Sequence, residues 1–483
     1  MQAGPRNYLR ELLRNQIWQS ANFVSKALFL VLLTPMMLAA WGDERYGLFA
    51  LASSLLVSMA LLDGGVRNLT RLRLVEATNA GDEEAYRRTF AFGVLTFGTV
   101  VLIATIAAAG LAAAGWLKEW FNLPAGGSLV LVVTVALTGT MMMSIFGLEP
   151  RAARGSLSSM KAANTWGALV AIPVVAGAVW AGCDVLAAVV LYSLCLIVPN
   201  VLYMISDGVF ALQPWRYVTQ FTPRVFAATL RDGFWYYLTT VALVVKTHAL
   251  TFVVAAMAGP AEAGIFYILL RFTELIGTVG ATASETSLAE LAAAGSDAER
   301  GRSFRQGWSY VALFSLYGAV GLALLGDHAL DLWLRGHYEL REGTMIAMAV
   351  FGLAGALSRM VVNASMGLGA ARGAAIGNLF EAVADVALAA VGYRLLGLPG
   401  LFLGGSLGIL CMLPAAVRVS TRCDRSWVGN YLRPLLPLLP GLAGAAAMLA
   451  IAARFSHWSA WMVGAGAAGI LALISLRRMH AAA

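Results

Sequence analysis

The sequence predicts an all-α polytopic membrane protein with about fourteen transmembrane helices. Apolar side chains make up 59% of the 483 residues and charged side chains only 12%, roughly half the charged share of a soluble domain. The apolar residues gather in runs of about 20, the length that a helix needs to cross a bilayer. The loops between these runs carry Lys and Arg mainly on one side, as membrane insertion requires.

The same composition excludes several other classes. A soluble enzyme of this length needs more polar surface, and the apolar runs exclude a disordered chain. Membrane orientation accounts for the net charge of +8, so we expect no nucleic-acid partner. The four cysteines show no CxxC spacing and indicate packing thiols. No motif indicates a catalytic site, a metal site or a cofactor.

Each predicted span is an apolar run bounded by polar or turn-forming residues. The spans cover 17–40, 46–66, 89–114, 128–148, 163–182, 184–206, 234–258, 263–285, 308–326, 344–368, 374–393, 398–417, 435–453 and 458–476. Arg6, Arg10 and Arg14 lie in the polar segment before the first span. This segment predicts an amphipathic helix at the inner membrane surface over residues 1–16 and argues against a cleaved signal peptide.

The distribution of positive charge predicts the orientation. With the N-terminus in the cytoplasm, 24 of the 34 lysines and arginines fall in cytoplasmic segments, 6 in outer loops and 4 within spans. This bias follows the positive-inside rule, and an even number of spans places both termini in the cytoplasm. A missed span would invert the bias in every later loop.

A short motif occurs twice in equivalent places. Gly42–Phe49 and Gly259–Phe266 both read Gly-x4-Gly-aliphatic-Phe, 217 residues apart, and each lies between an outgoing and a returning span. Ala80–Gly81 matches Ala294–Gly295 in the cytoplasmic loops that follow. Six spans separate the copies, so the halves share one topology. Two parallel six-helix halves around an axis along the membrane normal are a known transporter plan.

The repeat predicts the domain organisation. The segments are a surface helix over 1–16, an N-terminal six-helix bundle over 17–206, a cytoplasmic linker over 207–233, a C-terminal six-helix bundle over 234–417, and a loop with a terminal helix pair over 418–483.

Four sequence blocks resemble a known family: Asn22–Lys26 (NFVSK), Leu33–Pro35 (LTP), Gly42–Phe49 (GDERYGLF) and Leu62–Gly65 (LDGG). They look like polysaccharide-unit flippases, for O-antigen or exopolysaccharide, of the multidrug/oligosaccharidyl-lipid/polysaccharide exporter superfamily. Gly259–Phe266 and the later arginine in span 8 look like the second-half counterpart. The resemblance covers roughly residues 15–425.

This resemblance implies a function. The expected protein is a non-enzymatic flippase in the bacterial inner membrane. It would move a polyprenyl-diphosphate-linked oligosaccharide from the cytoplasmic to the outer leaflet by alternating access of two bundles. Glycan polymerase and export machinery are further expected partners. One departure stands out: many members look like having an aspartate in the seventh span, where this chain has Lys246.

Ionisable and polar groups within spans are the candidate site residues, because they are costly in a bilayer. In the first span, Gln19, Asn22 and Lys26 share one helical face. Such a face lines either a wet cavity or a hydrogen-bonded helix seam.

Spans 7 and 8 carry further candidates. We expect Lys246 to face the cavity, whereas His248 points away because two residues turn a helix by about 200°. Arg271 and Glu274 are spaced to pair with each other, or Arg271 presents its guanidinium to a diphosphate. Lys26, Lys246 and Arg271 are expected to bind substrate in a cavity lined by spans 1, 2, 7 and 8.

Spans 10 and 11 hold a second polar group. Arg359 and Asn363 share a face of span 10, and Asn378, Glu381 and Asp385 share a face of span 11. Arg359 is counted as a fourth substrate-binding cation of the cavity, and Asn363 as a polar residue that lines it. Glu381 could pair with Arg359, the two acids could hold Lys246, or, with Glu274, they could provide a coupling-cation site.

Two other functions stay open. A multidrug or cation antiporter shares this architecture, but it needs cation-friendly cavities, and the first span has a lysine and no acid. A membrane-embedded glycan polymerase or ligase would need a catalytic outer loop; the longest, over 327–343, is polar but short.

Overall fold

The computed structural model describes residues 5–58, 66–153, 157–293, 296–338, 340–423, 428–455 and 458–482. The chain divides into two compact units, each described here by itself. Unit 1 comprises Met1–Val244 and Thr251–Ile265, and unit 2 comprises Val245–Leu250 and Phe266–Ala483. The described elements are helical, as the fold class predicts.

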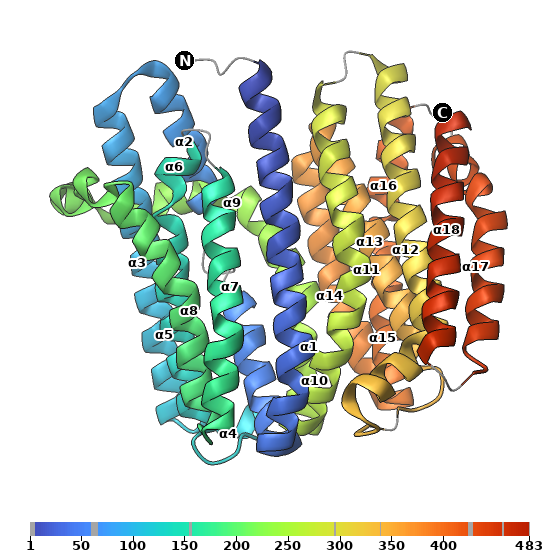
Figure 1. Ribbon diagram of the computed structural model, residues 1–483. Helices are drawn as coiled ribbons and strands as arrows, with labels where there is room; N and C mark the ends of the chain where they lie inside the picture. The colour runs from blue at the N-terminus through green and yellow to red at the C-terminus, as the bar shows by residue number, and fades with distance from the viewer. Residues whose placement is uncertain are drawn as a thin grey trace. The chain divides into compact units, whose positions relative to one another are not determined.

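Unit 1 is built from long helices joined by short turns (Figure 1). Its elements are α1 (Pro5–Ser58), α2 (Val66–Ala80), α3 (Glu83–Ala113), α4 (Trp116–Phe121), α5 (Gly127–Phe146), α6 (Glu149–Ala153), α7 (Leu157–Trp180), α8 (Val185–Ser206), the 3₁₀ turns η2 (Val209–Leu212) and η3 (Pro214–Gln220), and α9 (Pro223–Val244). Most of α10 (Leu250–Ala258) and the start of α11 (Pro260–Ala293) also belong to this unit.

Unit 2 begins with a π-helical turn, η4 (Val245–Ala249), and includes most of α11. It continues with α12 (Asp297–Leu334), α13 (Thr344–Gly367), α14 (Ala371–Leu396), α15 (Leu398–Leu407), η5 (Gly408–Met412), α16 (Leu413–Cys423), η6 (Val428–Leu432), η7 (Arg433–Leu438), α17 (Leu439–Ala452) and α18 (Trp458–Ala482). The last two helices, red in Figure 1, run side by side.

Ten helical segments in the described part of the chain are long and apolar enough to cross a membrane. Each coincides with a predicted span; Val185–Ser206 and Thr344–Gly367, for example, match 184–206 and 344–368. The predicted spans 17–40, 46–66, 234–258 and 263–285 fall on α1, α9–α10 and α11, some of whose side chains lie outside the described residues. The protein is therefore a multi-pass membrane protein.

Glycines with positive φ occur at equivalent places in the two copies of the predicted repeat. Gly42 breaks α1 with φ 73°, and Gly259 separates α10 from α11 with φ 89°. Gly126 and Gly343, which are also 217 residues apart, precede α5 and α13 with φ 80° and 82°. Glycine adopts this conformation at little steric cost. The second copy of the cytoplasmic-loop match, Ala294–Gly295, lies outside the described residues.

The two copies of the glycine motif pack against each other within unit 1. A Cβ atom built at Gly47 would lie 1.7 Å from the carbonyl oxygen of Pro260, and one at Gly264 would lie 3.1 Å from Gly47 Cα. Side chains of any size are excluded at Gly47. The first glycine of each motif therefore permits a turn, and the second permits the backbones of the two copies to cross closely.

The structure differs from the predicted organisation at two places. The predicted surface helix over 1–16 is continuous with the first span, because α1 begins at Pro5 and runs to the break at Gly42. The seventh-span helix begins at Pro223, inside the predicted linker over 207–233, and the boundary between the units falls after Val244.

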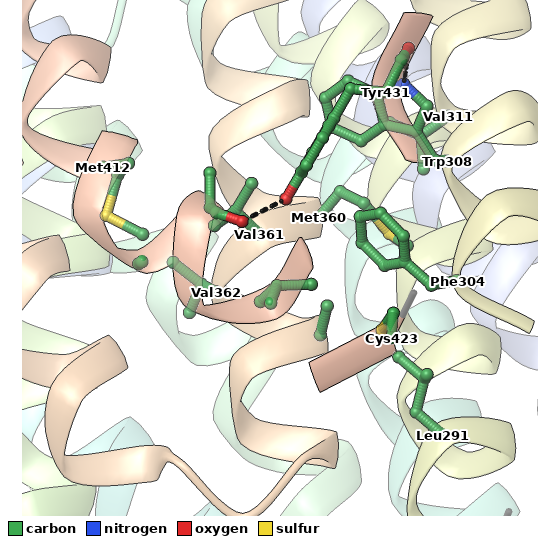
Figure 2. Packing of buried hydrophobic residues seen from close by; sticks show 14 of the residues in the cluster. Leu291, Phe304, Trp308, Val311, Met360, Val361, Val362, Met412, Cys423 and Tyr431 are labelled. Carbon is green, nitrogen blue, oxygen red and sulfur yellow. Dashed lines mark hydrogen bonds between the residues drawn. The ribbon is translucent and has the colours of Figure 1, made fainter. Parts of the chain in front are cut away.

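One core cluster of unit 2 joins α16 and η6 to α12 and α13 (Figure 2). Tyr431 packs between Phe304 and Trp308 with ring centroids 5.3 Å and 4.8 Å away. Its hydroxyl donates to the carbonyl of Ala416 at 2.8 Å, and its own carbonyl accepts from Trp308 Nε1 at 3.0 Å. Through Tyr431 of η6, these contacts fix α16 against α12.

Candidate functional site

The seventh-span helix changes geometry where its charged residues lie. Between α9 and α10 the chain forms the π-helical turn η4, which carries Lys246 and His248. Single π-helical turns occur frequently at functional sites. His248 is only 3% exposed, whereas the Lys246 side chain is 15% exposed, consistent with the expectation that the two point in different directions.

Lys246 is held by two side chains from other spans of unit 2. Its ammonium forms an ion pair with the Glu381 carboxylate of α14 and donates to Ser358 Oγ of α13 at 3.0 Å. Ser358 in turn donates to Glu381 Oε2 at 2.6 Å. The three groups form a closed triangle in which a buried cation meets a buried anion. Of the alternatives for the acids, the structure has Glu381 holding Lys246.

Asp385 lies one turn further along α14 and is 5% exposed. Its Oδ1 has no hydrogen-bond partner among the described residues. This oxygen lies against Gly408 at the start of η5, where a Cβ atom would be only 1.7 Å away. The polar cluster therefore lies between two departures from α-helical geometry, η4 and η5.

Arg271 of α11 forms a separate group in the same unit. It pairs with Glu274 at 2.5 Å, donates to the Tyr267 hydroxyl at 2.5 Å, and lies 4.4 Å above the Tyr267 ring. The side chains of Arg271 and Glu274 are 22% and 25% exposed. The predicted i, i+3 pair is present, and the pair stays accessible.

The other predicted residues are placed as follows. Asn378 is 5% exposed, on the same buried face of α14 as the two acids. Arg359 and Asn363 are half-buried on α13. Asn22 is half-buried on α1, and the side chains of Gln19 and Lys26 lie outside the described residues. The predicted cavity that unites Lys26 with Lys246 and Arg271 stays a prediction.

Sequence reasoning missed one charged group in unit 1. Glu149 is fully buried and accepts from Arg67 Nε at 2.6 Å and from Arg71 Nε at 2.5 Å. Both arginines are among the 24 positive charges assigned to cytoplasmic segments. Only the isolated glutamate next to a proline at the end of a long apolar run hinted at a partner.

Known structures share this architecture. The lipid II flippase MurJ in an inward closed conformation matches with a TM-score of 0.69 and 12% identity, over 95% of this chain and 97% of that chain. An inward-facing multidrug resistance MATE family transporter of the MOP superfamily matches with 0.62 and 16%, over 86% and 99%. The MATE multidrug transporter DinF-BH in complex with R6G matches with 0.61 and 14%, over 89% and 98%.

The chain has the fold of MOP superfamily transporters. The sequence itself matches no family model and no curated protein. The assignment of the MOP-type fold therefore rests on structural similarity alone. Within that fold, the cluster of Lys246, Ser358, Glu381 and Asp385 is the candidate functional site of unit 2.

Proposed function

We propose that this MOP-type protein is a flippase for a polyprenyl-diphosphate-linked oligosaccharide. It moves the lipid from the cytoplasmic to the outer leaflet of the bacterial inner membrane, for surface polysaccharide synthesis. Both termini face the cytoplasm. Glycan polymerase and export machinery act on the same lipid-linked product.

The observation that carries this proposal is the extent of the structural match. The likeness to the lipid II flippase covers 95% of this chain, against 86% and 89% for the two multidrug transporters, although nearly all of each of those chains is matched. The difference is comparable in length to the terminal helix pair α17–α18. A lipid-linked substrate is therefore favoured over a soluble drug.

The ion pairs of unit 2 support a mechanism in which substrate exchanges with internal carboxylates. Without substrate, Lys246 and Arg271 are each neutralised by an acid of the protein, Glu381 and Glu274. A diphosphate offers the same kind of acceptor oxygens as a carboxylate, with more charge. Substrate binding then breaks the internal pairs, and release lets them form again.

This exchange explains how the empty carrier returns. Moving two negative charges outward gains roughly 4.6 kcal/mol per 100 mV of interior-negative potential, at about 2.3 kcal/mol per charge. If the empty carrier returned with Lys246 and Arg271 unpaired, moving their charge would lose that gain. Return with reformed pairs moves little net charge, so no coupling ion is required. In the alternative version, Asp385 or Glu381 takes up a proton or sodium during return.

A second candidate is a multidrug or cation antiporter. The matches to multidrug transporters favour it, as does the unpartnered carboxylate oxygen of Asp385. The two candidates differ in which residues transport requires, because a cationic drug needs the acids and repels Lys246 and Arg271.

Glycan export in cells tests the proposal. Lys246→Ala, Arg271→Ala and Glu381→Gln are compared at matched protein levels. Loss of export in both cation variants, with export in Glu381→Gln slowed but not abolished, supports uncoupled flipping, because Glu381→Gln leaves Lys246 without its counter-charge only during return. Normal export in both cation variants contradicts phosphate binding at these residues, and drug efflux lost with the acids supports the antiporter.

A further inference from the structure

Unit 2 has a small, open surface pocket at the turn between α13 and α14, with a volume of about 20 Å³. Its walls come from the end of α13, the first turn of α14 and one face of α16, and its lining includes Ser365, Leu368, Gly373, Ala374, Arg418 and Arg422. Positive charge in the loops predicts that this end faces the cytoplasm. The polar cluster around Lys246 contributes nothing to this lining.

The pocket gathers positive charge without an acidic partner. Arg418 and Arg422 lie one turn apart on α16, and the lining contains no acidic residue. Arg422 donates one N–H to the carbonyl of Leu368 at 2.7 Å, which fixes its guanidinium at the turn. No hydrogen bond or ion pair joins the Arg418 guanidinium to the described residues.

The positive charge of Arg418 lies beside the N-terminal end of helix α14, where a cation is unfavourable. A Cβ atom built at Gly373 would be 3.1 Å from Arg418 Nη1, so this guanidinium lies over the first turn of α14. Helix N-termini carry partial positive charge and leave their first N–H groups without intrahelical partners. An anion bound beside Arg418 at this turn would satisfy both, and phosphate is the anion that such sites favour.

An exposed apolar surface continues from the pocket. Ile376 and Phe380 follow Gly373 on nearly the same face of α14 and are 37% and 66% exposed. On α16, Leu413 and Val417 are 48% and 49% exposed beside the arginines. The acyl chains of a lipid whose phosphate occupies the pocket would lie on this surface, so the surface favours a lipid headgroup over free phosphate as the occupant.

We propose that this pocket binds the phosphate of an anionic phospholipid of the surrounding leaflet, with Arg418 and Arg422 as its ligands. The site is independent of the proposed transport function. It anchors the α13–α14 turn to the headgroup region, where basic side chains attract anionic lipids.

Native mass spectrometry on the full chain tests this site. The protein is equilibrated in phosphatidylcholine nanodiscs with a minor share of phosphatidylglycerol, and retained phosphatidylglycerol is counted after release. We expect loss of about fivefold for Arg418→Ala and again for Arg422→Ala, the factor for one basic side chain at an anionic surface. Arg302→Ala is the matched control, since Arg302 is an exposed arginine of α12 that does not line the pocket; it should keep the lipid.

A second variant tests whether binding needs the space of the pocket in addition to the two positive charges. Gly373→Leu fills the space beside Arg418 and keeps both arginines, on a helical position where leucine is favourable; it should also lose the lipid. Equal loss in Arg302→Ala, or full retention in Gly373→Leu, overturns the proposal. Thermal stabilisation by inorganic phosphate as strong as that by phosphatidylglycerol, or displacement by stoichiometric polyprenyl diphosphate, overturns the phospholipid as the occupant.

Discussion

Lys246 and Glu381 form an ion pair between the π-helical turn η4 and α14, although 134 residues separate them in the sequence. Ser358 bonds to both partners and closes the triangle. Glu381 is 2% exposed, so neither charge is well compensated by solvent. We therefore expect the pair to affect the stability of unit 2. It also neutralises the positive charge of Lys246 when no substrate is bound.

Removing only one partner of this pair should destabilise unit 2. Glu381→Gln leaves the Lys246 ammonium partly buried without its anion, and breaking a buried pair costs about 3–5 kcal/mol. The measurement is thermal unfolding in one detergent at one pH. An unchanged midpoint would contradict the buried pair.

The double variant Lys246→Met/Glu381→Gln is the control for this loss. It removes both charges, so its stability should recover most of the way to the wild type, with a favourable coupling in the double-mutant cycle. Transport should not recover, because the proposed phosphate ligand, Lys246, is gone. Recovery of both properties would argue that the pair is structural only.

The Glu149 group of unit 1 gives a second stability prediction. Glu149→Gln should cost about 2 kcal/mol, below the loss for a fully buried pair, because Arg67 and Arg71 remain 29% and 27% exposed. The matched variant is Asp207→Asn, whose surface partner is Arg151; it should cost at most about 1 kcal/mol. Equal losses in the two variants would refute the distinction.

The crossing at Gly47 should not tolerate a methyl group. Gly47→Ala places Cβ against the carbonyl of Pro260, and overpacking of this kind costs about 1–3 kcal/mol. Gly110→Ala is the control, since nothing lies within 4 Å of its Cβ position on α3; there alanine should be neutral or stabilising. Unfolding curves that rank the two variants the other way would contradict the close crossing.

Topology can be tested by cysteine labelling in a background without the four native cysteines. Ala80 is exposed at the C-terminal end of α2, and Ala125 is exposed in the turn before α5. We expect a membrane-impermeant thiol reagent to label Ala80→Cys only from the cytoplasm and Ala125→Cys only from outside. The reverse pattern at either position would overturn the orientation.

The sequence contains enough information to locate the spans, because hydropathy and charge act locally along the chain. The predicted span over 308–326 shows the limit: the helix itself is Asp297–Leu334. Hydropathy indicates only the part of a helix that lies in lipid. Helix α12 extends beyond that part, because the charged residues at its start also favour helical structure. The repeat was recognisable because both copies need glycine at the same turn.

The partners within the candidate site were harder to predict. Sequence spacing relates residues on one helix, which is why Arg271 with Glu274 was foreseen. It left Glu381 with several possible partners, since the distance between helices depends on packing. The π-helical turn at Lys246 has no sequence signal of its own, and Arg67, Arg71 and Glu149 meet across helices that hydropathy cannot pair.

The most direct test of the account is flipping of a fluorescent polyprenyl-diphosphate-linked sugar in proteoliposomes, read by quenching from outside. With an interior-negative potential and no ion gradient, the wild type should move the lipid outward. Lys246→Gln should abolish this movement, while Lys246→Arg should keep part of it. Movement by Lys246→Gln at the wild-type rate, or no movement by the wild type without a proton or sodium gradient, would contradict carboxylate–diphosphate exchange at Lys246.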